Sequence, residues 1–266
     1  MNSNTTSAIN SANMQRLKDR VAIVTGASSG IGAAVAEAFA REGAQVVIDH
    51  LGESACAEAL SKRITSGGGK AIVVEADVSH GNDVRQMVER THDAFGTVDI
   101  LVNNAGIYPR DDWDSMTEEK WRRVIDVNLT GCYLCSHAVS ADMKTAQYGK
   151  IINVSSIAFV SGMSLVHYGS SKAGVVGFTR SLACVFGAYN VCVNAILPGA
   201  IRVEREKELD SAEKRSVTER KAIAAQCIKR RGTPKDTVGA FIFFASHESD
   251  WITGHCLSVD AGYTRY

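Results

Sequence analysis

Short runs of apolar, mostly β-branched residues alternate with longer segments of helical period from Arg20 onward. The runs are candidate strands, and they occupy residues 21–25, 45–49, 71–76, 99–103, 150–155, 191–197 and 256–260. Several are apolar on successive positions, which is typical of strands covered on both faces, and the segments between them are long enough for crossover helices. The pattern predicts an α/β fold, a single Rossmann-like domain with a doubly wound parallel sheet of about seven strands and helices on both faces.

Two segments depart from this rhythm. Residues 1–17 begin with a stretch rich in Ser, Asn and Thr, so we expect a flexible N-terminal tail followed by one domain over residues 18–266. Residues 202–221 are dense in Arg, Lys and Glu and are typical of a solvated surface helix. A long polar insertion before the last strand is also where substrate lids occur, so a lid over residues 202–226 is a second interpretation.

Composition and charge narrow the class of partner. The chain has 266 residues and a formal net charge of zero, so a small-molecule partner is favoured and no nucleic-acid surface is expected. The longest apolar stretches fall far short of the roughly 20 residues that span a bilayer, which predicts no membrane association. Scattered cysteines without a signal-peptide pattern favour reduced thiols and a cytoplasmic location. Cys132 and Cys135 form a lone CxxC, a weak metal signal, so no metal site is expected.

A glycine-rich turn follows the first candidate strand. The string TGASSGIG over residues 25–32 precedes a helical run that closes at Gly43. Its glycines let a pyrophosphate approach the backbone, and the following helix offers unpaired N–H groups and the positive end of its dipole. Ser28 and Ser29 add hydroxyl donors. A tight connection without a ligand is the alternative, but strand, glycine turn and helix in that order favour a nucleotide cofactor.

A tyrosine and a lysine four residues apart form the candidate acid/base pair. Tyr168 and Lys172 share one face if the segment is helical. Free tyrosine, with a pKa of about 10, is a weak base at neutral pH. An ammonium beside the phenol stabilises the phenolate and lowers its pKa, so the spacing predicts that Lys172 activates Tyr168 for proton transfer. An ordinary helical pair is the alternative for these two residues taken alone.

Further motifs occur in a fixed order along the chain. They are ADV ending at Val78, NNAG over residues 103–106, DVNLTG around Asn128, NVSS ending at Ser156, YGSSK from Tyr168 and LPGA from Leu197. Together with TGxxxGxG they resemble the short-chain dehydrogenase/reductase family, and the similarity covers essentially residues 18–266. Within that family the chain looks most like bacterial secondary-alcohol dehydrogenases. The resemblance implies NAD or NADP as cofactor, hydride transfer between a secondary alcohol and a ketone, and a homotetramer.

The resemblance also implies roles for individual residues. Tyr168 is the general acid/base, Lys172 in addition holds the nicotinamide ribose, and Asn128 positions a water that links the lysine to solvent. A serine donates to the substrate oxygen: the register of the strand end selects Ser156, whereas the family's usual interval to the tyrosine selects Ser155. We favour Ser156 because a loop absorbs a deletion more easily than a strand shifts register. The predicted catalytic residues are therefore Asn128, Ser156, Tyr168 and Lys172.

The predicted cofactor-binding residues follow successive candidate strands or belong to the acid/base pair. They are Gly26, Ser28, Ser29, Gly30, Ile31, Gly32, Asp49, His50, Asp77, Val78, Asn104, Ala105, Gly106, Tyr168, Lys172, Pro198, Gly199 and Ile201. Asp49 lies one position before the usual acid of NAD-preferring relatives, His50 occupies that place, and no Arg or Lys follows in the turn. The missing base favours NAD slightly and leaves NADP open.

The substrate pocket is expected from the segments after NNAG, between the serine and the tyrosine, and after Gly199. The predicted substrate contacts are Tyr108, Ser156, Phe159 and Tyr168, and further candidates for the pocket wall are Pro109, Trp113, Val160, Met163, His167, Ile201 and Val203. This lining is largely apolar, which suits a hydrophobic or aromatic alcohol or ketone. The alternatives are an NADPH-dependent 3-oxoacyl-thioester or carbonyl reductase, a sugar or polyol dehydrogenase, and a cofactor-binding regulator without turnover.

Overall fold

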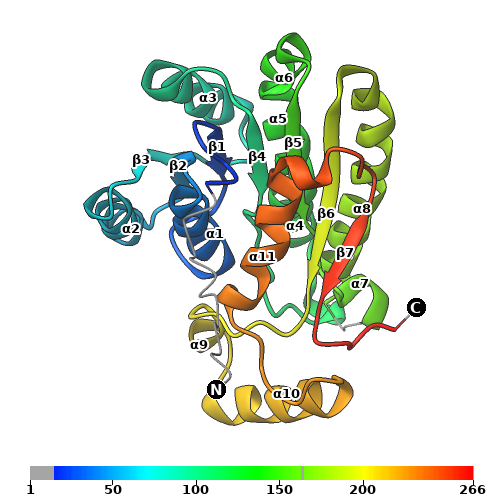
Figure 1. The fold of residues 1–266 in the computed structure, drawn as a ribbon. Helices are drawn as coiled ribbons and strands as arrows, with labels where there is room; N and C mark the ends of the chain where they lie inside the picture. The colour runs from blue at the N-terminus through cyan, green and yellow to red at the C-terminus, as the bar shows by residue number, and fades with distance from the viewer. Residues whose placement is uncertain (1–14, 163–164, 266) are drawn as a thin grey trace, which may run out of the picture.

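All seven predicted strands form one parallel sheet in the computed structural model, which describes residues 15–162 and 165–265 (Figure 1). The strands are β1 (Val21–Val24), β2 (Gln45–His50), β3 (Lys70–Glu75), β4 (Ile100–Asn103), β5 (Gly149–Val154), β6 (Val191–Pro198) and β7 (Cys256–Val259). Their order across the sheet is β3-β2-β1-β4-β5-β6-β7. The chain therefore works outward from β1 to one edge and then returns to build the other half, which is the predicted doubly wound topology.

Helices cover both faces of the sheet. One layer holds α1 (Gly30–Arg41), α2 (Ser54–Ser66) and α11 (Pro234–Ala245), and the other holds α3 (Gly81–Phe95), α5 (Gly131–Ala138), α6 (Ser140–Ala146) and α8 (Val166–Phe186). Successive residues of a strand point to opposite layers, so Ala22 and Val24 of β1 pack with the first layer and Ile23 with the second. Two apolar cores result, one on each face of the sheet. Because each strand is buried on both faces, its residues are apolar at successive positions, which explains the continuous apolar runs of the sequence.

The packed domain begins earlier than predicted. Leu17 is fully buried in the core against α1, and the Arg16 guanidinium forms an ion pair with Glu42 at 2.6 Å. The predicted tail boundary at residue 17 is therefore wrong by at least two residues, because a single apolar side chain in a polar stretch gives little periodicity to detect. The rest of the predicted tail, residues 1–14, lies outside the described residues.

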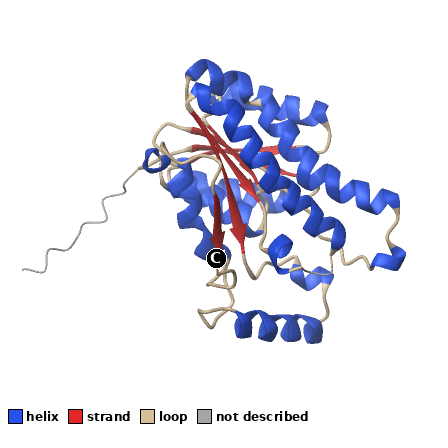
Figure 2. Ribbon diagram, turned by 90° about the vertical axis from the view of Figure 1, so that its right-hand side faces the viewer, coloured by secondary structure: helices blue, strands red, loops and turns tan. Residues whose placement is uncertain are grey.

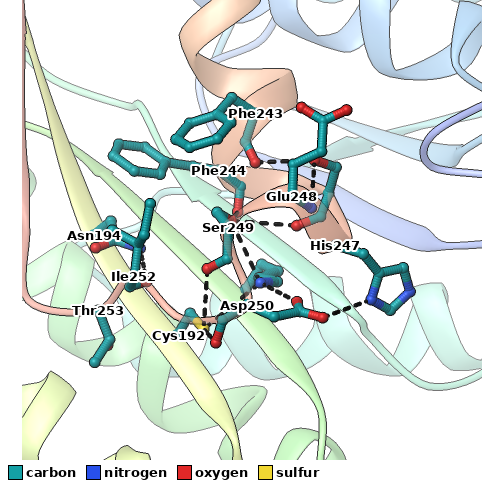
Figure 3. A network of polar contacts seen from close by, with 12 residues as sticks. Cys192, Asn194, Phe243, Phe244, His247, Glu248, Ser249, Asp250, Ile252 and Thr253 are labelled. Atoms are coloured by element: carbon teal, nitrogen blue, oxygen red, sulfur yellow. Dashed lines mark hydrogen bonds and ion pairs between the residues drawn. The ribbon is translucent and has the colours of Figure 1, made fainter.

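A polar network fixes the connection between α11 and β7 (Figure 3). The Ser249 hydroxyl donates to the Phe244 carbonyl at 3.1 Å, and Asn194 of β6 donates from its side chain to the Ile252 carbonyl at 2.7 Å. Buried Lys150 of β5 reaches Asp250 at 2.7 Å. These bonds hold the last strand in register at the end of the sheet opposite the carboxyl ends of β5 and β6.

The polar segment before the last strand forms two helices outside the layers. These are α9 (Glu206–Leu209) and α10 (Ala212–Ala225), and neither buries a residue. They lie beyond the carboxyl ends of β6 and β7 (Figures 1 and 2). We call residues 202–226 the lid segment after the second predicted interpretation, and its role as a lid stays a prediction.

Neither a membrane helix nor a metal site emerges from the described ranges. No helix there has the length and apolarity to cross a bilayer, and no three or more His, Cys, Asp and Glu side chains gather to hold a metal ion. The seven cysteines are all free thiols. Cys132 and Cys135 are buried, and burial raises the pKa of Cys132 to about 11, so this thiol stays protonated at neutral pH.

Candidate active site

A cavity of about 710 Å³ opens at the carboxyl ends of the strands, where the strand order reverses between β1 and β4. Eighteen of the predicted site residues line it: Gly26, Ser28, Ser29, Gly30, Ile31, Asp49, Asp77, Val78, Asn104, Ala105, Gly106, Tyr108, Ser156, Tyr168, Lys172, Pro198, Gly199 and Ile201. Four others, Gly32, His50, Asn128 and Phe159, do not line it. Residues far apart in the sequence thus meet because parallel strands end at one edge of the sheet.

The glycine turn between β1 and α1 is shaped to receive phosphate. Gly26 and Gly30 have φ values of 59° and 58°, which favour glycine, and a Cβ on Gly26 would lie 2.9 Å from the Ala105 backbone. The amino end of α1 follows Ser29, lines the cavity and carries no acidic residue in its first turn, so its free N–H groups and dipole favour an anion there. These features fit the pyrophosphate of a dinucleotide.

Gly32 has a different role from the one predicted. A Cβ at this position would lie 2.5 Å from both the Asn104 side-chain nitrogen and the Gly26 carbonyl. Gly32 therefore lets the turn close over β4 and does not face the cavity. Asn104 completes this packing by donating to the carbonyls of Thr25 and Gly26 at 2.8 and 3.0 Å.

The end of β2 brings the Asp49 carboxylate to the cavity. Asp49 is buried, its Oδ2 accepts from the Gly26 N–H at 3.0 Å, and its Oδ1 has no partner among the described residues. Burial, with a smaller contribution from the nearby charge of Asp77, raises the pKa of Asp49 to about 7. His50, in contrast, points into the protein because successive strand residues alternate, so its predicted cofactor contact is wrong.

Glu53 is a cavity residue that sequence reasoning missed. The Ser28 hydroxyl of the glycine turn donates to its carboxylate, and both residues line the cavity. Glu53 precedes α2 by one residue, and this acidic position before a helix was the available signal. A carboxylate here disfavours a 2′-phosphate and can accept from a ribose diol.

Asp77 after β3 is already bonded within the protein. Its Oδ1 accepts from the Ser79 N–H and hydroxyl at 2.9 and 2.6 Å, and its Oδ2 accepts from Arg123 at 3.0 Å. Burial raises the pKa of Asp77, but these bonds outweigh burial and hold it below its ordinary value. The carboxylate is therefore a fixed wall of the cavity.

Tyr168 and Lys172 share one face of α8, as the spacing predicts. Burial raises the pKa of Tyr168, while a hydrogen bond with Ser156 and the charge of Arg110 lower it. Burial lowers the pKa of Lys172, whose Nζ donates to the Val154 carbonyl at 2.7 Å and lies 5.7 Å from the centre of the Tyr168 ring. For Tyr168, burial outweighs the groups that lower the pKa, so the pKa of Tyr168 stays above its ordinary value in the protein without cofactor, and its activation by Lys172 stays a prediction.

The two serines after β5 have different partners. The Ser155 hydroxyl is buried and donates to the Lys172 carbonyl at 2.7 Å. The Ser156 hydroxyl accepts from the Ala158 N–H at 3.1 Å, and it lies close enough to Tyr168 to lower the pKa of that phenol. Ser156 therefore lies beside the tyrosine, and Ser155 anchors the helix that carries it.

Asn128 lies behind the cavity and connects the loop after β4 to α8. It lies in a π-helical turn, Asp126–Thr130, and is fully buried. Its Oδ1 accepts from the Ile107 N–H at 2.8 Å, and its Nδ2 donates to the Ile107 carbonyl and the Ser171 hydroxyl at 2.9 and 3.0 Å. These bonds tie the loop after β4 to α8, and the placement of a water by Asn128 stays a prediction.

The substrate end of the cavity lies against Tyr108, whose ring centre is 5.8 Å from that of Tyr168. Phe159 is a wrong prediction: it lies in α7 (Ala158–Ser161) and packs in a small cluster under β6 with Ile157 and Leu197. Trp113 is 69% exposed and also outside the cavity wall. Met163 lies outside the described residues.

The lid side of the cavity is more cationic than the sequence indicated. Its wall there includes Arg110, Arg205, Glu206, Lys221 and Arg231. Arg110 and Arg231 come from two loops and the other charges from the lid segment, where no periodicity predicts which side chains face the cavity. The cavity wall is mostly apolar, as predicted, and its cations gather on the lid side.

A doubly wound sheet with a phosphate-binding turn opposite a Tyr–Lys pair defines a nucleotide-dependent oxidoreductase by its fold and site. Comparison with known proteins agrees: the family model described as "Enoyl-(Acyl carrier protein) reductase" matches residues 26–264. The chain belongs to the short-chain dehydrogenase/reductase family.

Individual relatives match nearly the whole chain. A 3-oxoacyl-[acyl-carrier-protein] reductase from Synechocystis sp. is 37% identical over 255 residues, which cover 95% of this chain and 100% of the relative. An L-rhamnose 1-dehydrogenase (NAD(P)(+)) from Azotobacter vinelandii is 41% identical over 253 residues, 92% of this chain and 97% of the relative. The crystal structure of a short-chain type dehydrogenase/reductase from Mycobacterium marinum superposes with a TM-score of 0.86 at 31% identity, covering 96% and 99% of the two chains.

Proposed function

We propose that the protein interconverts a secondary alcohol and a ketone, with Tyr168 as general acid/base and NAD or NADP as cofactor. The observation that carries the proposal is the arrangement of Tyr168 and Ser156 in one cavity with the phosphate-binding turn. The family and the relatives, whose names include dehydrogenases and a reductase, support an oxidoreductase that acts on CH–OH groups.

The chain's own groups fit the proton part of this reaction. In oxidation the Tyr168 phenolate accepts the hydroxyl proton while the C–H bond breaks, and in reduction the phenol returns that proton. The Ser156 hydroxyl donates to the substrate oxygen, where negative charge develops. The Lys172 ammonium lies at the carboxyl end of β5, directly before Ser155 and Ser156. A bound nicotinamide ring supplies the hydride acceptor or donor.

Tyr168→Phe tests the proposal. It should lower kcat by about 10²- to 10⁴-fold, the usual contribution of a general acid/base, for any substrate found in a panel of apolar ketones, sugars and 3-oxoacyl thioesters. Binding of NADH, read by fluorescence, should persist, because the phenol is not part of the phosphate site. Tyr148→Phe is the matched control, since this ring lies against His247 outside the cavity. Equal effects of the two variants on kcat would exclude the assigned role.

We also propose a preference for NAD. The carboxylates of Asp49 and Glu53 line the cavity, and no Lys or Arg lies between them. Initial rates with NAD and NADP measure the preference, and Glu53→Gln should narrow it by removing charge that repels a 2′-phosphate. A strong preference of the unaltered protein for NADP contradicts this proposal and leaves the assigned chemistry intact.

A further inference from the structure

Arg110 connects the reacting tyrosine to the lid segment. Its Nη2 lies 2.7 Å from Asp210, which joins α9 and α10, and its guanidinium carbon lies 5.4 Å from the centre of the Tyr108 ring. Tyr108 in turn packs against Tyr168. Burial raises the pKa of both tyrosines and the charge of Arg110 offsets part of that rise, so its field reaches the position where the substrate oxygen would lie.

Most of the hydrogen-bonding capacity of Arg110 is unused. A guanidinium has five N–H donors in a planar fork, and Asp210 is its one acceptor among the described residues. The side chain keeps 33% of its surface exposed and lines the cavity. Donors therefore remain for a planar anion that approaches from inside the cavity.

The surroundings carry excess positive charge. Arg205 and Lys221 of the lid segment line the same cavity, and neither has a carboxylate within 4.0 Å among residues 15–162 and 165–265. Glu206, the carboxylate on this side of the cavity wall, is already paired with Arg231. A neutral alcohol would leave these cations uncompensated, whereas an anionic ligand would neutralise part of the charge.

We propose that Arg110, assisted by Arg205 and Lys221, binds a carboxylate of the substrate while its carbonyl or carbinol carbon lies at Tyr168. The substrate is then an oxo acid or hydroxy acid, with the two groups separated by a chain that passes along the Tyr108 ring. This inference rests on the proposed function, since it places the reacting carbon at Tyr168. It assigns Asp210 the role of holding Arg110 toward the lid when no anion is bound.

Matched acids and esters test the subsite. Acetoacetate, 4-oxopentanoate and 5-oxohexanoate are compared with their methyl esters as substrates for reduction, and their binding in the presence of NADH is measured by calorimetry. At least one acid should bind about tenfold or more tightly than its ester, as expected for a charge-assisted hydrogen bond. Arg110→Gln should abolish that ratio through KM, and Arg110→Lys should restore part of it.

Asp210→Asn distinguishes a role of Arg110 in substrate binding from a role only in holding the lid segment through its ion pair. This variant breaks the ion pair and keeps the guanidinium, so the acid-over-ester ratio should persist or increase. If Arg110→Gln and Asp210→Asn weaken acid and ester alike, Arg110 only fastens the lid and the proposal is overturned. Calorimetry also decides when nothing in the panel turns over: absence of any acid preference in binding refutes the subsite, whereas acid binding without turnover counts against the proposed function alone.

Discussion

At the scale of single residues, we expect different effects from replacing the two serines after β5: one variant should lose activity and the other stability. Ser156→Ala removes the hydroxyl beside Tyr168 and should lower kcat by about 10²-fold, in the range found for donors to a developing oxyanion. Ser155→Ala removes the buried bond to the Lys172 carbonyl and should lower the free energy of unfolding by about 1 kcal/mol, with a smaller effect on kcat. Steady-state kinetics and urea unfolding of both variants distinguish the roles. The reverse pattern would make Ser155 the catalytic serine.

Asp49 predicts a pH dependence of stability in the cofactor-free protein. Its pKa is about 7 in the folded state against 3.8 for the free group, because burial disfavours the charged form. Between about pH 4 and pH 7 the unfolded chain has released this proton and the folded chain still binds it, so the Asp49 contribution destabilises the fold increasingly as pH rises through this window. Asp49→Asn should therefore raise the melting temperature more at pH 8 than at pH 5.

Thermal unfolding at both pH values measures this effect. Asp114→Asn, an exposed carboxylate outside the cavity, is the matched control and should change little at either pH. If Asp49→Asn raises the melting temperature equally at pH 5 and pH 8, the Asp49 carboxyl has the same pKa in the folded and the unfolded chain, and this prediction is wrong.

At the scale of elements, two helix glycines differ in what surrounds them. A Cβ on Gly131, which begins α5, would lie 2.9 Å from a Val78 methyl and 3.3 Å from the Val78 carbonyl, and Val78 lines the cavity. A Cβ on Gly239 in α11 would meet nothing within 4 Å. Gly131→Ala should lower the melting temperature and weaken NADH binding, whereas Gly239→Ala should stabilise by up to about 1 kcal/mol through helix propensity.

Calorimetric scans and NADH titration of the two variants check the contrast. A destabilised Gly239→Ala would mean that this face of α11 is covered. An unchanged NADH affinity in Gly131→Ala would show that Val78 can move aside without disturbing the cofactor site.

The sequence predicted the elements better than the side-chain directions. The seven strands lie within a residue or two of their predicted bounds, because burial on both faces produces runs that few other structures need. The π-helical turn that turns Asn128 away from the cavity was not predictable, since its extra residue is set by packing between the loop after β4 and α8. Phe159 was placed wrongly and Arg110 was missed, because a four-residue helix and a short loop carry no period that says which side chain faces the cavity.

At the scale of the whole molecule, apolar surface remains on the layer that contains α5 and α8. Tyr133 of α5 is 50% exposed and Val185 of α8 is 58% exposed. A shallow hollow between α3 and α5 is lined by Val84, Val88 and Leu134. Such a surface is typical of an interface between subunits, and the homotetramer that the family resemblance implies stays a prediction.

We predict that this layer, rather than the lid segment, holds the tetramer together. Tyr133→Asp places a charge in the middle of the layer's exposed apolar surface and should shift the mass in solution from a tetramer to a smaller species, because an interface core excludes unpaired charge. Val217→Asp on α10, which is 41% exposed, is the matched control and should leave the mass unchanged. Light scattering after size exclusion measures both. A monomeric unaltered protein, or a tetramer that tolerates Tyr133→Asp and dissociates with Val217→Asp, would contradict this assignment of the interface.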